Sequence, residues 1–217
     1  EDRVKGYRNF LNKLWNANNF LITNECDFTD IDNISNLKVN INKWIYSELI
    51  IAKTKIEKNL KDYRFDEAAK NAYQFAWHSY CDWYLELSKT ILFSDNKDAK
   101  NEVKKVSSYI FKQILILLHP FIPFVTEKIW LKNKFDNSNK DFLMLANWPS
   151  GEVNKDTSTD HVEKIISIIS ELRSFKNELN VSPGSFIDMS IVNINDKQKK
   201  FISSNEIILK KLGRINN

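Results

Sequence analysis

The chain has 217 residues, of which 42% are hydrophobic and 12% aromatic. A disordered chain of similar charge would be poorer in both classes, so the composition predicts one folded domain, or one domain with a small appendage. The 32 basic and 28 acidic residues leave a formal net charge of only +4. This balance is compatible with a nucleic-acid partner but does not indicate one by itself.

Cysteine usage and hydropathy exclude several other classes. Cys26 and Cys81 are isolated and lack C-x-x-C spacing, so we expect no metal site and a reducing compartment, the cytoplasm. The sequence has no run of about 18 apolar residues that could span a bilayer. It also lacks an N-terminal signal peptide. We therefore expect no membrane partner. We also expect a monomer, and the helical pattern of residues 1–20 predicts that the chain begins inside a larger protein.

Helical periodicity dominates the first two-thirds of the chain. The first helix is predicted to reach about Phe20, with the stripe Val4, Tyr7, Leu11, Leu14 and Asn18. After a loop over 23–36, a second helix spans 41–62, a third spans 64–89, and a fourth follows a turn at 94–97. Pro120 and Pro123 predict that this fourth helix stops and that a short fifth helix starts and ends near Trp130. Residues 132–140 are expected to form a mobile polar loop.

The third helix has a wide apolar face. Its stripe at spacings of three and four consists of Phe65, Ala69, Ala72, Ala76, Tyr80, Trp83 and Leu87, with Trp77 and Tyr84 beside it. Such a face is typical of a helix inside a bundle. We expect Trp77, Trp83 and Trp130 to be core residues. Asp82, next to this stripe, should pair with a basic residue of a neighbouring helix because an unpaired buried carboxylate is costly.

The character of the sequence changes after Pro149. Residues 150–159 are predicted to be a linker, and Asp160 with Glu163 to cap a helix that carries apolar residues as far as Leu179 and ends at 182–184. Ile187, Met189 and Ile191 alternate with polar residues, which indicates a half-buried strand whose partner lies beyond Asn217 or in an unrecognised element. A last helix is expected over 204–213. We therefore predict a mainly α protein, with a helical bundle at 1–149 and a linker plus the start of a small α/β subdomain at 150–217.

No catalytic centre is predicted. The three histidines are His78, His119 and His161, and His119 belongs to the helix junction. His78 and Cys81 stand three residues apart on one helix, which permits a Cys–His pair, but a thiolate nucleophile also needs an orienting third group. We therefore assign these residues structural roles.

The order of motifs resembles one family over nearly the whole chain. The motifs are GYRNFLNKLWNANNF at 6–20, NKWIYSEL at 42–49, RFDEAAKNAYQFAWHSYCDWYLELSK at 64–89, LHPFIPFVTEKIW at 118–130, NWP at 147–149 and ELRSFKNELNVSPG at 171–184. Together they resemble the anticodon-binding domain of valyl-tRNA synthetases, which are class I enzymes, and CDWYLELSK favours this family over isoleucyl and leucyl enzymes. The fold is thus expected to be the helical bundle of this domain type.

The resemblance implies that a parent enzyme joins valine to its tRNA with ATP and Mg²⁺. The HIGH and KMSKS elements of class I catalytic domains are absent, so the catalytic domain would lie elsewhere in the parent chain, and this part alone would be inactive and hold no cofactor. The alternatives are the same domain of an isoleucyl or leucyl enzyme, or a helical interaction module without an RNA role. A KMSKS element upstream of the chain would favour a synthetase.

The expected RNA surface combines the end of the first helix with the start of the second. Asn12, Lys13, Asn16 and Asn19 follow one polar side of the first helix, where amides can bind base edges and Lys can bind phosphate. On the second helix, Lys43 and Ser47 flank Trp44, which could stack on a base or anchor the end of the bundle. The resemblance favours stacking, because the family carries an aromatic residue there that is implicated in anticodon contact. At Asn19 the sequence departs from the family, in which Arg is usual.

Overall fold

The computed structural model describes residues 2–28, 34, 36–133, 135, 142–151 and 157–216, except for the side chains of 2–4 and 157–158. These residues form two compact units, 1–156 and 157–217. The predicted mainly α fold is confirmed. The predicted linker extends too far, because its last residues, 157–159, already belong to a helix, while 152–156 lie outside the described residues.

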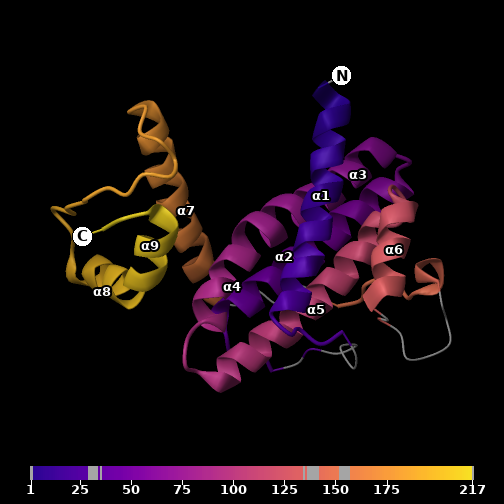
Figure 1. Ribbon diagram of the computed structural model, residues 1–217, viewed down its shortest axis with the longest axis horizontal. Helices are drawn as coiled ribbons and strands as arrows, with labels where there is room; N and C mark the ends of the chain where they lie inside the picture. Colours follow the sequence, from indigo (N-terminus) through magenta and orange to yellow (C-terminus); the bar gives the residue numbers. More distant parts are fainter. Residues whose placement is uncertain are drawn as a thin grey trace. The chain divides into compact units, whose positions relative to one another are not determined.

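The described residues of the first unit form a bundle of six α-helices and one π-helix (Figure 1). Its elements are α1 (Asp2–Thr23), α2 (Asn40–Lys61), α3 (Phe65–Gln74), the π-helix η1 (Phe75–Tyr84), α4 (Leu85–Leu92), α5 (Lys97–Leu118), α6 (Pro123–Asn133) and the short 3₁₀-helix η2 (Leu143–Leu145). Helix α5 packs against α1, α2, α3, α4 and α6. Asn96 caps the N-terminus of α5, because its side chain accepts a hydrogen bond from the backbone N–H of Ala99. The predicted stop at Pro120 and restart at Pro123 are confirmed.

The third predicted helix is continuous and consists of α3, η1 and α4, with the π-helix η1 in the middle. In a π-helix, N–H and C=O groups five residues apart pair, so Phe75, Tyr80 and Leu85 share the buried face, exposed by only 3%, 0% and 6%. The prediction assumed an α-helical repeat throughout. The core prediction was wrong for Trp77 and Trp83 of η1, which are only half buried. It was also wrong for Phe65, which is the first residue of α3 and 56% exposed.

The buried side of this continuous helix carries a connected set of hydrogen bonds. The Tyr80 hydroxyl donates to the backbone oxygen of Ser107 at 2.9 Å. The Tyr84 hydroxyl donates to Asn42 Oδ1 at 2.8 Å. Asn42 in turn donates from Nδ2 to Glu102 of α5 at 2.9 Å. Both tyrosines are fully buried, so these bonds satisfy polar atoms that would otherwise destabilise the core.

Other predicted boundaries of the first unit also need correction. Tyr7 of the α1 stripe is 66% exposed because the first turns of α1 extend beyond the neighbouring helices (Figure 1). The side chain of Val4 is outside the described set. Within the predicted loop 132–140, Lys132 and Asn133 belong to α6. Phe135 is 4% exposed and packs on Phe28 and Trp130. The remaining residues of that loop, and 29–33 and 35 of the first loop, lie outside the described residues.

The described residues 157–216 of the second unit form three helices, α7 (Thr157–Glu178), α8 (Asp196–Ser204) and α9 (Glu206–Gly213). Because α7 starts at Thr157, the Asp160–Glu163 pair lies inside it and does not cap it. The helix ends at Glu178, and Leu179 is 58% exposed rather than buried. The sequence prediction missed α8 and placed its last residue, Ser204, in the final helix.

The predicted strand is reduced to one residue in the described part of the chain. Ile187 forms an isolated parallel bridge with Ile215. Its N–H donates to the oxygen of Arg214 at 3.0 Å, and its oxygen accepts from the N–H of Asn216 at 2.9 Å. The partner of Ile187 is thus an unrecognised element of this chain, which is one of the two alternatives that the sequence left open.

Candidate nucleic-acid interface

Three amides form an exposed row along α1. Asn12, Asn16 and Asn19 are separated by four and three residues, so they lie on one face of the helix. All three side chains are exposed. Arg8, four residues before Asn12 and also exposed, extends the row with a cation that the sequence analysis did not select. The four-residue spacing between Arg8 and Asn12 could have predicted that Arg8 lies on the same helical face.

Lys13 lies beside this row and already has an anionic partner. Its ammonium group donates to Asp82 of η1. The same group lies 4.0 Å from the ring centroid of Trp77. Asp82 also contacts His78, with 3.2 Å between Oδ2 and Nδ1. The expected partner of Asp82 is therefore Lys13, and this pair fixes α1 against the π-helix.

The residues expected on α2 differ strongly in exposure. Trp44 is only 4% exposed, whereas Lys43 and Ser47 are half buried. A ring this deeply buried cannot stack on a base in this conformation. The burial of Trp44 therefore favours the alternative role, an anchor that closes the end of the bundle.

The start of α2 is held by a residue from another helix. Val39, the residue before the first turn, has no side-chain cap. The carboxylate of Glu102 on α5 accepts instead from the backbone N–H of Lys38 at 3.1 Å and of Val39 at 2.9 Å. Negative charge at a helix N-terminus is favourable. Glu102 thus sets the position at which α2 presents Lys43 and Ser47.

The π-helix connects the α1 and α2 parts of the candidate surface. On one side it receives Lys13 at Asp82. On the other side, Ser79 donates to Glu48 of α2 at 2.9 Å. A shallow recess of about 260 Å³ continues from Glu48 along α2, with Lys55, Gln74 and His78 in its lining. Ser47 and Lys55 are eight residues apart, so they follow the same side of α2.

A second aromatic side chain lies close to the amide row. Trp15 is half buried, and the ammonium group of Lys132 from α6 lies 4.8 Å from its ring centroid. This pair could not be predicted from the sequence, because Lys132 comes from a helix more than a hundred residues away in the chain.

The titratable groups nearby are not arranged for covalent chemistry. Burial raises the pKa of the Cys81 thiol from 9.0 to about 12, despite the opposing effect of Lys13. The thiol therefore stays protonated, and His78 contacts Asp82 instead. His119 contacts Thr126 at 2.9 Å and lies in the helix junction. Among the described residues, no group of His, Cys, Asp and Glu side chains is arranged to hold a metal ion.

Residues 42–191 match the family model described as the anticodon-binding domain of tRNA ligase. The chain belongs to this family. The match covers most of the bundle and extends into the second unit, while the amide row of α1 precedes it.

Valine–tRNA ligases of several bacteria are similar to the chain along its length. It is 78% identical to that of Pelagibacter ubique (strain HTCC1062), over 100% of the chain and 25% of the relative. Identity is 34% with the enzyme of Mesorhizobium japonicum, over 98% of the chain and 23% of the relative. For Bartonella quintana the identity is 35%, over 98% of the chain and 24% of the relative. The chain thus spans about a quarter of the length of these relatives.

None of the helices in the described ranges has the length and apolar character needed to cross a membrane.

Proposed function

We propose that the chain is the tRNA-binding part of a valine–tRNA ligase and that it recognises the anticodon loop of valine tRNAs. The observation that carries the proposal is the 78% identity to the Pelagibacter valine–tRNA ligase over all 217 residues. ATP and Mg²⁺ would be used by the catalytic domain of the parent enzyme, because the chain lacks both the HIGH and KMSKS elements. The parent enzyme would act in the cytoplasm, and we expect a monomer.

The exposed amides of α1 would bind the bases. Sequence-specific RNA recognition targets unpaired bases, whose edges accept and donate hydrogen bonds to side chains. Asn12, Asn16 and Asn19 supply both donors and acceptors on one helical face. An unpaired anticodon loop fits this chemistry better than a duplex, whose base edges are less accessible.

Both lysines would contribute to phosphate binding, since each has a partly exposed side chain. Lys13 must exchange its ion pair with Asp82 for a phosphate, and that exchange reduces its net gain. We assign a phosphate contact to Lys43 as well, at the start of α2, with Ser47 as a hydrogen-bonding neighbour. Trp44 would support this surface from within the bundle.

The proposal is tested by titrating the chain with an anticodon stem-loop of a valine tRNA. Asn16→Ala should weaken binding by about 0.5–1.5 kcal/mol, the usual net value of one hydrogen bond. Asn101→Ala is the matched control because Asn101 is an exposed amide on α5. If both variants lost the same affinity for the stem-loop, or if neither lost any, the amide row would not be part of the RNA-binding surface.

Salt dependence separates phosphate contacts from base contacts. Lys43→Ala should reduce the slope of log affinity against log salt by about 0.7, the value for one phosphate contact on a single strand. The exposed Lys105 of α5 provides the control variant, Lys105→Ala. An unchanged slope for Lys43→Ala would contradict the phosphate assignment.

Two alternatives are resolved by the same titration. An isoleucine or leucine tRNA stem-loop that bound more tightly than the valine stem-loop would assign the chain to one of those enzymes. A chain that bound none of the stem-loops would instead be a helical interaction module.

A further inference from the structure

The indole of Trp15 shares one face of α1 with the amide row. The positions i, i+3, i+4 and i+7 of this face are taken by Asn12, Trp15, Asn16 and Asn19. The three amides are exposed, whereas Trp15 is half buried on the side of α1 that meets α6. Residues three and four apart on a helix are neighbours, so an RNA strand that binds the amides also passes the indole.

The ring of Trp15 is covered by a lysine from another helix. The ammonium group of Lys132, in the last turn of α6, lies 4.8 Å from the ring centroid. Asn133, the next residue, donates from Nδ2 to Oδ1 of Asn18 on α1, which holds the end of α6 beside the indole. Among the described residues, Lys132 has no carboxylate within ion-pair distance, and the indole contacts no second cation or aromatic ring.

A second lysine–tryptophan pair lies on the other side of the amide row, but it is held in place. Lys13 is 4.0 Å from the ring centroid of Trp77 and also donates to Asp82. The Trp77 ring stacks on Tyr73, with 5.6 Å between the two centroids. Neither restraint acts on the Trp15 pair among the described residues. This pair can therefore open without breaking an ion pair or a ring stack.

The accessibility of the ring decides which tryptophan can stack on an unpaired base. Trp44, for which the sequence favoured stacking, is only 4% exposed inside the bundle. The Trp15 ring is covered by the end of one long, exposed lysine side chain. A phosphate carries a full negative charge and binds an ammonium group more strongly than a neutral ring does. An RNA strand that brings a phosphate next to Lys132 therefore draws the lysine off the indole.

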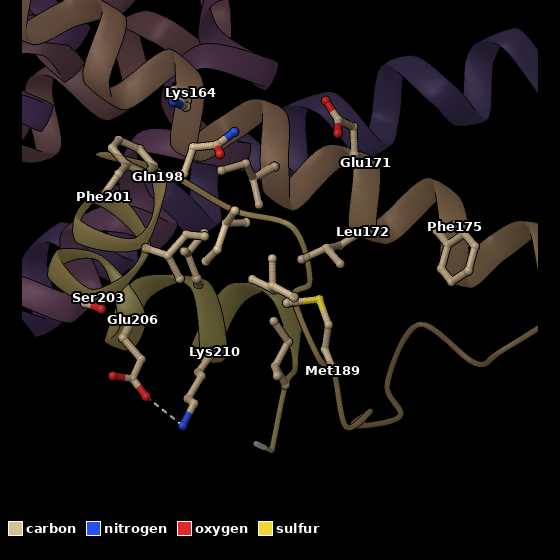
Figure 2. Close-up of a pocket in the computed structure, with 16 residues that line it drawn as sticks. Lys164, Glu171, Leu172, Phe175, Met189, Gln198, Phe201, Ser203, Glu206 and Lys210 are labelled. Atoms are coloured by element: carbon tan, nitrogen blue, oxygen red, sulfur yellow. Dashed lines mark ion pairs between the residues drawn. The ribbon is translucent and has the colours of Figure 1, made fainter. Parts of the chain in front are cut away.

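The groove of the second unit is a less suitable place for RNA. It has a volume of about 710 Å³ and lies between α7, α8, α9 and the segment 189–194 (Figure 2). Lys164 and Lys210, which line it, are offset by Glu171 and Glu206. Glu206 pairs with Lys210 at 2.8 Å, as the dashed line in Figure 2 shows. Such a balanced surface does not concentrate the positive potential that phosphate groups require.

We propose that Trp15 stacks on an unpaired base of the bound anticodon loop and that Lys132 leaves the indole to bind the phosphate of the same nucleotide. The inference rests on the proposed RNA-binding function and adds the end of α6 to the RNA-binding surface. The lysine covers the apolar ring in the unbound chain, and the base covers it in the complex. The ring is thus shielded from water in both states, so the exchange exposes no apolar surface.

Binding of a valine-tRNA anticodon stem-loop to the unchanged chain, to Trp15→Leu and to Trp15→Phe tests the stacking. Trp15→Leu keeps an apolar side chain without a ring and should bind roughly 5- to 150-fold more weakly, the range for one stacked base. Trp15→Phe should keep most of the affinity, because it retains a ring. Circular dichroism checks that both variants are folded. Equal affinity of Trp15→Leu and the unchanged chain would overturn the proposal.

Stem-loops with a single abasic site separate a direct contact from a structural role of Trp15. One abasic position in the loop should weaken binding to the unchanged chain. The same position should have no further effect in Trp15→Leu, which has already lost the stack. If every abasic position had the same effect in both proteins, Trp15 would be structural and the proposal would be wrong. If the unchanged chain bound no stem-loop, the proposed RNA-binding function itself would fail.

The salt dependence of binding tests the exchange of Lys132. Lys132→Gln should reduce the slope of log affinity against log salt by about 0.7, the value for one phosphate contact on a single strand. Lys128→Gln is the control, because Lys128 is exposed one turn earlier on α6, and its slope should not change. An unchanged slope for Lys132→Gln, or equal changes in the two variants, would overturn the exchange.

Discussion

The two units differ in how completely they enclose their apolar side chains. In the bundle, Tyr80, Tyr84 and Phe111 are fully buried, and both tyrosine hydroxyls have hydrogen-bond partners. In the second unit, Phe175, which lines an open groove, and Phe186 are each 56% exposed. Both units are mostly helical, so helix formation alone does not close a core. The bundle is closed because α5 packs against five other helices, whereas in the described part of the second unit α7 packs mainly on the short helix α9.

The largest expected effect compares one phenylalanine from each unit. Phe111→Ala should reduce the free energy of unfolding of the bundle by about 3–5 kcal/mol, because it removes a fully buried ring. Phe175→Ala should stay within about 0.5 kcal/mol, as is usual for surface positions. Urea unfolding followed by tryptophan fluorescence measures Phe111→Ala in the bundle, since all six tryptophans precede residue 149, and far-UV circular dichroism, which reports the helices of both units, measures Phe175→Ala. A small loss for Phe111→Ala would show that the bundle core is not closed.

A smaller effect tests how the start of α2 is fixed. Glu102→Ala removes the acceptor for two backbone N–H groups and should cost about 0.5–2 kcal/mol, the usual value of a helix cap. Glu57→Ala is the control, because Glu57 forms an i,i+4 ion pair with Lys53 on α2 and caps no helix among the described residues. Adding Val39→Asp to Glu102→Ala should recover part of the loss by capping α2 locally. If Glu102→Ala were no more costly than Glu57→Ala, α2 would not depend on the cap from α5.

Much of this architecture follows from sequence pattern, and the exceptions have physical causes. The break between α5 and α6 was predictable, because proline lacks the N–H that a helix needs. Helix α8 was also predictable in principle, since Asn195 and Gln198 form a capping box. The π-helix was not, because its hydrogen-bond repeat depends on packing that no local pattern specifies.

The candidate site was predictable only where it depended on a single helix. The exposed row of Asn12, Asn16 and Asn19 follows from spacing alone. The engagement of Lys13 by Asp82 and the burial of Trp44 depend on neighbouring helices. Residue type therefore indicated where RNA could bind but not which side chains were accessible.

The smallest expected effect concerns the two thiols of the bundle. Burial raises the pKa of Cys26 from 9.0 to about 11 and that of Cys81 to about 12. Between pH 9 and the folded-state values, the unfolded chain loses thiol protons that the folded chain keeps. Stability should therefore fall as pH rises above 9, and Cys81→Ala should reduce this fall in urea melts between pH 8 and 10.5. A pH dependence that was unchanged in Cys81→Ala would contradict the burial of this thiol.

The central claim is that RNA binds to the bundle and not to the second unit. The most direct test is photo-cross-linking of the chain to a valine-tRNA anticodon stem-loop that carries a photoreactive base in the loop, followed by peptide mapping. We expect cross-links in residues 12–19 of α1 and 43–47 of α2. Cross-links confined to residues 157–216, or to bundle helices outside these two segments, would contradict the account.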